Sequence, residues 1–125
     1  MINLSSYQSA IYKKLTSLGY NVYDEVPENA KFPYVVIGDM EFQESQWHFE
    51  DILDASVNLL IWSIWEGKKE VNDISSNIIN NFINLEDIKT GSQSLYRFSF
   101  GNSVVKRLDG VYNGSLALEF SVKQI

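Results

Sequence analysis

The sequence predicts a single α+β domain, in which two amphipathic α-helices pack on one face of a mainly antiparallel β-sheet. Two segments repeat apolar residues at helical spacing, and the last segment of the chain alternates apolar and polar residues as a strand does. A length of 125 residues is typical of one domain, so residues 1–125 are expected to form one unit. A sheet with both helices on one side is the simplest arrangement that buries both apolar stripes.

The first predicted helix covers residues 4–18. Its apolar positions are separated by three, four, four and three residues, which places them on one stripe. They are Leu4, Tyr7, Ile11, Leu15 and Leu18. Ser5 followed by Gln8 has the spacing of a capping box, and Gly19 is a common helix stop. An amphipathic helix with a capping box near its start and a stop at Gly19 is therefore expected, and it should lie on a sheet.

Three strands are predicted next, at residues 21–24, 34–42 and 55–65. Pro33 fits the start of the second strand, where its missing N–H costs little. This strand is almost continuously apolar, and we expect part of it to be covered on both faces. The third strand is expected to begin half-exposed and to end buried on both faces. Its two sides are formed by Ala55, Val57, Leu59, Ile61 and Ser63, and by Ser56, Asn58, Leu60, Trp62 and Ile64.

The second predicted helix follows Gly67 and repeats the spacing of the first. Its stripe consists of Val71, Ile74, Ile78, Phe82 and Leu85. A strand is then predicted around residues 96–100, and turns are predicted at residues 109–110 and 113–114, both of which end in glycine. The last strand is expected to direct Leu116, Leu118, Phe120 and Val122 inward. The second and third strands are adjacent in sequence and are expected to pair as a hairpin, with the connector at residues 43–51 as its tip.

Aromatic residues outside the helices have two interpretations. Tyr23, Phe32 and Tyr34 are expected to seal one end of the sheet. Trp62 and Trp65 are interpreted as core anchors, with a subunit interface, where tryptophan is enriched, as the alternative. In the polar connector, Trp47, His48, Phe49 and Glu50 combine large aromatic groups with charge. These four residues either pack back onto the domain or contact a partner, and we predict partner binding.

Composition argues against several classes of function. The net charge of −6 disfavours sequence-independent nucleic-acid binding, because an acidic surface repels phosphate. The chain has no cysteine and one histidine, and no nucleophile or phosphate-loop motif is present, so catalysis, a cofactor and a metal are not expected. The longest apolar run, at residues 59–65, is too short for a membrane helix, and the first residues do not form a signal peptide. A soluble binding or assembly protein is predicted.

The order of several short motifs resembles the tail-completion, or head–tail joining, family of long-tailed phages and prophages. The motifs are Tyr23-Asp24-Glu25-Val26-Pro27, then Phe32-Pro33-Tyr34-Val35, the strand Val57 to Ser63, and Arg107-Leu108-Asp109-Gly110 before the last strand. The resemblance covers nearly the whole chain. Residues 85–96 and 111–115 depart from the pattern, so no oligomer contact is inferred there.

The resemblance implies a non-enzymatic virion protein, made in the host cytoplasm and located at the junction of tail and head. It implies a ring, expected to contain six subunits, that contacts the major tail protein on one side and the head connector on the other. Viral DNA would pass through this ring without specific binding. Two alternatives stay open at this point: a tail terminator that caps growth of the tail tube, and a prophage-encoded monomeric regulator that binds a host protein.

Overall fold

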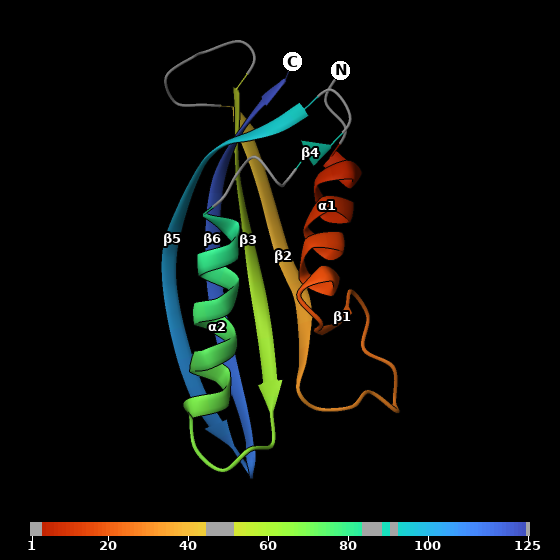
Figure 1. The fold of residues 1–125 in the computed structure, drawn as a ribbon, viewed down its shortest axis with the longest axis vertical. Coiled ribbons are helices and arrows are strands. Elements are labelled where there is room, and N and C mark those ends of the chain that lie inside the picture. The colour runs from red at the N-terminus through yellow and green to blue at the C-terminus, as the bar shows by residue number, and fades with distance from the viewer. Residues whose placement is uncertain (1–3, 45–51, 84–88, 91–92, 125) are drawn as a thin grey trace.

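The computed structural model describes residues 4–44, 52–83, 89–90 and 93–124. It consists of two layers, a six-stranded sheet and two helices that lie against one face of this sheet (Figure 1). The predicted α+β fold class is therefore confirmed. In chain order the elements are α1 (Leu4–Ser17), β1 (Asn21–Tyr23), β2 (Tyr34–Glu44), β3 (Ile52–Ser63), α2 (Lys69–Phe82), β4 (Lys89–Thr90), β5 (Gln93–Leu108) and β6 (Val111–Gln124).

The strands lie in the order β1-β2-β3-β6-β5-β4. Neighbouring strands are antiparallel except β1 and β2, which are parallel. β3 and β6 form the centre of the sheet and keep one register throughout, from Ile52 opposite Lys123 to Ser63 opposite Tyr112. β2 and β3 pair as the predicted hairpin. The central β3–β6 pair therefore supports β2 on one side and β5 on the other.

Both helices lie on the same face of the sheet (Figure 1). Each buries most of its predicted apolar stripe against that face, although Leu18, just beyond α1, is only half-buried. The buried helix side chains are Tyr7, Ile11, Leu15, Val71, Ile74, Ile78 and Phe82, and those of the sheet are Val22, Val35, Ile37, Ala55, Val57, Leu59, Ile61, Leu116, Leu118 and Phe120. Leu4, at the start of α1, is exposed instead of buried, and Leu85 lies outside the described residues. The core therefore lies between the helices and one face of the sheet.

The two ends of α1 compare differently with the prediction. The helix already begins at Leu4, so Ser5 lies within its first turn and the predicted capping box is wrong. Gly19 adopts a φ of 94°, the left-handed conformation that commonly ends a helix and that glycine adopts without steric cost. The predicted helix stop is confirmed.

The hairpin of β5 and β6 corrects the sequence prediction. β5 continues to Leu108, and Asp109 and Gly110, with φ of 45° and 82°, form the two-residue turn into β6. The turn predicted at residues 113–114 is wrong, because both residues lie within β6. Gly114 lies beneath α2, where an added Cβ would overlap Cγ1 of Val71. Glycine at this position makes room for the helix and does not turn the chain.

β2 and β5, which flank the central pair, contain β-bulges. In β2 the register shifts between Ile37 and Met40, so that two residues face Asn58 alone. Gly38 lies in this bulge, and a Cβ there would come within 2.7 Å of the Asn58 carbonyl oxygen. β5 shifts register twice, between residues 95 and 97 and between residues 100 and 102. Each bulge changes which residues of the strand face away from the helices.

Candidate interaction surface

The residues predicted to bind a partner, Trp47, His48, Phe49 and Glu50, lie outside the described residues. The strands on either side of them are described, and the last paired positions are Glu44 of β2 and Leu53 of β3. The segment therefore joins adjacent ends of an antiparallel pair, which confirms the hairpin. Its role in docking stays a prediction.

The sheet has a second face, which carries no helix in the described part of the chain and is called here the helix-free face (Figure 1). Residues directly opposite each other in an antiparallel sheet point to the same side, so the register arranges this face in rows. Across β2, β3, β6 and β5 the rows are Tyr34, Trp62, Asn113 and Lys106; Val36, Leu60, Ser115 and Val104; and, beyond the bulges, Glu41, Ser56, Glu119 and Ser99.

One half of the helix-free face is apolar. This apolar end is defined by Tyr34, Val36, Leu60, Trp62, Val104 and Leu108. All six side chains are half-exposed or exposed. The expectation that part of β2 and the end of β3 are buried on both faces is therefore wrong, because both helices pack on the opposite side. An exposed apolar surface of several neighbouring side chains indicates a site of protein contact.

Tyr34 is the centre of an aromatic cluster at this end of the sheet. Its ring centroid lies 5.1 Å from that of Phe32, 5.7 Å from that of Tyr23 and 6.5 Å from that of Trp62. Ring pairs at these separations attract each other beyond the area that they bury. The predicted aromatic closure of the sheet by Tyr23, Phe32 and Tyr34 is confirmed, and Trp62 extends it onto the helix-free face.

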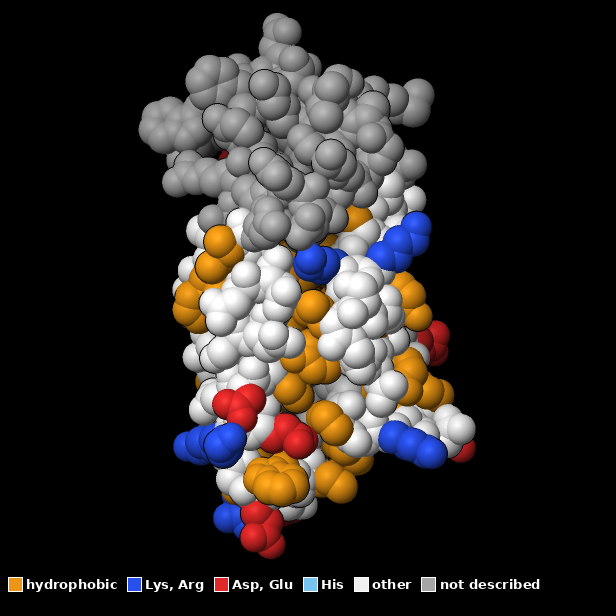
Figure 2. Space-filling view, viewed as in Figure 1, with side chains coloured by type: hydrophobic (Ala, Val, Ile, Leu, Met, Phe, Trp, Pro, Cys, Tyr) orange, Lys and Arg blue, Asp and Glu red, His pale blue; other side chains and the backbone are white. Residues whose placement is uncertain are grey.

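Trp65 is not a core anchor, because its side chain is 60% exposed. β3 ends at Ser63, whose hydroxyl donates to Oε1 of Glu70 at 2.7 Å and accepts from the backbone N–H of Trp65 at 3.0 Å. These bonds tie the end of β3 to the first turn of α2, and Ile64 and Trp65 stay outside the core. Figure 2 shows apolar side chains at this lower end of the molecule, next to acidic and basic groups.

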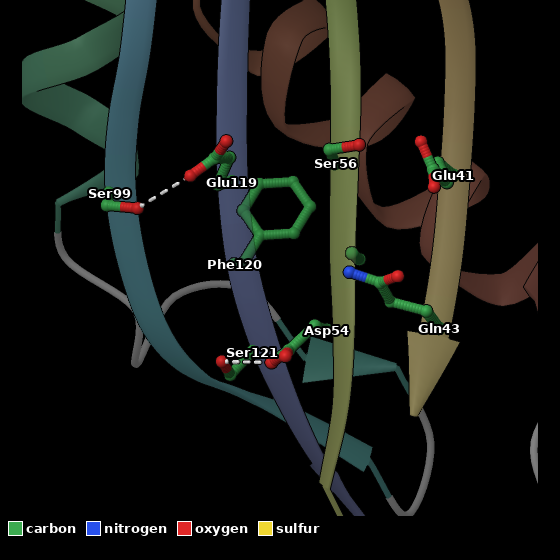
Figure 3. A pocket seen from close by; sticks show the side chains of 9 residues that line it. Glu41, Gln43, Asp54, Ser56, Ser99, Glu119, Phe120 and Ser121 are labelled. Carbon is green, nitrogen blue, oxygen red and sulfur yellow. Dashed lines mark hydrogen bonds between the residues drawn. The ribbon is translucent and has the colours of Figure 1, made fainter. Parts of the chain in front are cut away.

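The other half of the helix-free face is polar and contains a hollow of about 420 Å³ (Figure 3). Three carboxylates, those of Glu41, Asp54 and Glu119, line it. The hydroxyl of Ser121 donates to Asp54 at 2.9 Å, and that of Ser99 donates to Glu119 at 3.5 Å. Gln43, Ala55, Ser56 and Phe120 complete the lining. The hollow is open and acidic, and it lies on the strands immediately beyond the apolar end.

A free strand edge borders the apolar end. β5 pairs with β4 only at Gln93 and Ser94, so from Leu95 to Leu108 its outer edge has no strand partner among the described residues. Val104, Lys106, Arg107 and Leu108 are exposed along this edge. Unpaired edges with exposed apolar side chains readily pair with another chain.

This edge was not predicted from the sequence, because the expected strand at residues 96–100 did not extend over residues 101–108. The available signal was the turn at Asp109 and Gly110, since a two-residue hairpin turn requires a strand on each side. The glycine and asparagine at residues 101 and 102 concealed the strand, and the structure places them at a bulge.

The described residues contain no group of three or more histidine, aspartate and glutamate side chains that could hold a metal ion. The helices that the structure describes are also too short or too polar to cross a bilayer.

The chain is similar to known proteins both in sequence and in structure. Residues 10–120 match the family described as tail completion protein gp17. A chain from the virion of a native gene transfer agent particle is similar in structure, with a TM-score of 0.75, 16% sequence identity and 93% of each chain covered. The gp17 protein of bacteriophage SPP1 has a TM-score of 0.55 and 22% identity, over 98% of this chain and 92% of that one. Comparison with curated protein sequences gives no match.

At these identities the two solved structures establish a shared fold. The family match extends over most of the chain and includes the motifs on which the resemblance rests, from the aromatic cluster to the turn between β5 and β6. The resemblance predicted from the sequence is confirmed, and the chain belongs to the tail completion protein gp17 family.

Proposed function

We propose that the chain is a structural virion protein that joins the phage tail tube to the head connector. It acts as a ring, expected to contain six subunits, at the head-proximal end of the tail. Membership of the tail completion family supports this role. The apolar end of the helix-free face is the observation that carries it, because this surface extends across four strands to the free edge of β5. A surface of this kind favours assembly over a monomeric function.

The ring contacts the major tail protein on one side and the head connector on the other. Viral DNA passes through it without specific binding. The net charge of −6 and the carboxylates of the polar hollow support passage, because they repel phosphate and do not retain it. The role is structural and needs no catalytic group or cofactor.

The tip of the β2–β3 hairpin is the docking element for one of these partners. Trp47 and Phe49 provide aromatic anchors, and His48 and Glu50 provide polar contacts beside them. A turn that only reversed the chain would need two to five residues, typically with glycine, asparagine or aspartate. The connector at residues 43–51 is longer than this and contains no glycine.

The proposal is tested in particles of the phage or prophage that encodes the chain. Electron microscopy should locate the protein as a ring at the head–tail junction, and deletion of its gene should leave separate filled heads and tails. Tails of abnormal length after deletion would indicate a tail terminator instead. A protein not found in the particle would contradict the proposed function.

Replacing Trp47 and Phe49 together by serine tests the docking element. We expect a folded protein with a nearly unchanged thermal midpoint, together with heads and tails that fail to join. If the two aromatic side chains packed on the domain itself, the free energy of unfolding of the variant would fall by about 3–5 kcal/mol for each buried aromatic residue. A folded variant that still gave infectious particles would rule out both roles for these residues.

A further inference from the structure

The two edges of the sheet carry opposite charges at the apolar end. On the β5 edge, Lys106 and Arg107 are exposed between Val104 and Leu108. On the other edge, the connection from β1 to β2 exposes three acids, Asp24, Glu25 and Glu28, and one base, Lys31. This connection also contains Phe32, which contacts Tyr34 of the apolar end. Each edge therefore combines apolar side chains with charges of one predominant sign.

These charges have no opposite partner within the described part of the chain. None of Lys106, Arg107 or the three acids forms an ion pair there, whereas Lys69 and Asp73 on α2 do, at 2.9 Å. The β5 edge and the acidic connection are too far apart in the sheet to neutralise each other, because β2, β3 and β6 lie between them. The two sets of charges are therefore available to another molecule.

The strand directions of the two edges also suit an antiparallel contact between two copies. β5 runs opposite to β6, β6 opposite to β3, and β3 opposite to β2, so β5 also runs opposite to β2 and to its parallel neighbour β1. When one copy is rotated about an axis roughly along the strands, its β5 edge approaches the β1–β2 edge of the next copy in an antiparallel sense. Such a contact joins two different surfaces and can repeat until it closes a ring.

We propose that the subunits associate edge to edge, with a second copy of this chain as the occupant of each edge. Val104, Lys106, Arg107 and Leu108 of one copy lie against the acidic β1–β2 connection of its neighbour, so the apolar ends form one band around the ring. The inference rests on the proposed ring and specifies which surfaces build it. Like charges placed at such a contact prevent association, and opposite charges favour it.

Charge reversal tests the contact. Lys106→Glu with Arg107→Glu (the edge variant) and Asp24→Lys with Glu25→Lys (the connection variant) should each reduce the yield of joined particles by at least about tenfold. All four side chains are exposed, so the folded state should be retained, and thermal unfolding checks this. Lys68→Glu with Lys69→Glu is the matched control, because it reverses another adjacent basic pair that lies at the start of α2, and it should leave joining unchanged.

Combining the variants gives the decisive result. A chain with all four reversals should recover joining, because each interface again brings opposite charges together. Co-expression of the edge variant with the connection variant should recover it too, since alternating copies are complementary at every contact of a ring with an even number of subunits. If neither experiment restored joining, the inference would be overturned.

Cross-linking provides a second readout if a reversed variant misfolds. The chain has no cysteine, so Glu25→Cys with Arg107→Cys introduces the only thiols. Oxidised particles should give a ladder of linked subunits, whereas Asp73→Cys with Arg107→Cys should not. Absence of the ladder from particles whose images contain the ring would overturn the edge contact and leave the proposed function intact. Absence of the protein from the head–tail junction would instead contradict the proposed function.

Discussion

Leu59 and Leu60 are adjacent leucines on one strand, and they have opposite environments. Leu59 is fully buried beneath the helices. Leu60 points to the helix-free face, opposite Val36 and Ser115, and is half-exposed. The same residue type thus stabilises the fold on one face and remains available for contact on the other. Hydrophobicity alone does not decide which role a residue has, because the role depends on what covers it.

The sharpest test of this difference is a matched pair of alanine substitutions. Leu59→Ala should reduce the free energy of unfolding by about 2–5 kcal/mol, because it leaves a cavity in the core. Leu60→Ala should cost only about 1 kcal/mol, since water already reaches that side chain. Urea unfolding of the two purified variants measures both values. Equal losses would mean that the two faces are equally buried in solution.

Gly114→Ala tests how closely α2 approaches the covered face. The added methyl group overlaps Val71, so we expect a loss of about 1–3 kcal/mol in the free energy of unfolding. The same substitution should cost clearly less in a Val71→Ala background, which provides the missing space. A strictly additive double variant in denaturant unfolding would show that the two residues do not touch.

Substitutions of Trp62 and Trp65 compare a half-exposed tryptophan in the aromatic cluster with an exposed one outside it. Trp62→Ser should cost about 1–2 kcal/mol, because it removes the ring contact with Tyr34. Trp65→Ser should change the free energy of unfolding by no more than about 0.5 kcal/mol, as is usual at exposed positions. Thermal unfolding monitored by circular dichroism distinguishes them. A larger loss for Trp65→Ser than for Trp62→Ser would contradict the described exposure.

The smallest effect is expected on the solvent side of α2. Asp73 accepts a hydrogen bond from Lys69, and this bond, followed by the attraction of the charges, raises the pKa of Lys69 above its ordinary value. Asp73→Asn should therefore lower the pKa of Lys69 in an NMR titration. Because the pKa of Lys69 is higher in the folded chain than in the unfolded chain, the pair stabilises the fold fully at a pH below the pKa of the unfolded state. This contribution disappears as the pH rises through the pKa of the folded state. Stability near neutral pH should change little, because the pair is exposed.

Much of the covered face was predictable from the sequence. The stripes of α1 and α2 and the inward residues Leu116, Leu118 and Phe120 follow from periodicity, since each element buries one side. The predicted turn at residues 113–114 failed because the reason for Gly114 is tertiary. Only the packing of Val71 against β6 explains this glycine, and that contact is not visible in local sequence.

The helix-free face was less predictable. Apolar residues such as Val36 and Leu60 suggested burial on both sides, because composition does not reveal whether a second layer exists. The rows that bring Val104 next to Ser115 depend on the register of β5, which two bulges shift. The docking role of Trp47, His48, Phe49 and Glu50 stays a prediction.

The bulges in β2 and β5 also determine how the sheet tolerates insertions and deletions. In β2, Tyr34 and Val36 face away from the helices before the bulge, and Glu41 and Gln43 do so after it. Deleting Asp39 alone would remove the bulge and restore a regular alternation, in which Glu41 and Gln43 still face away from the helices. A single codon lost within the bulge would thus keep inside and outside along the strand, whereas the loss of both Gly38 and Asp39 would turn Glu41 and Gln43 toward the core.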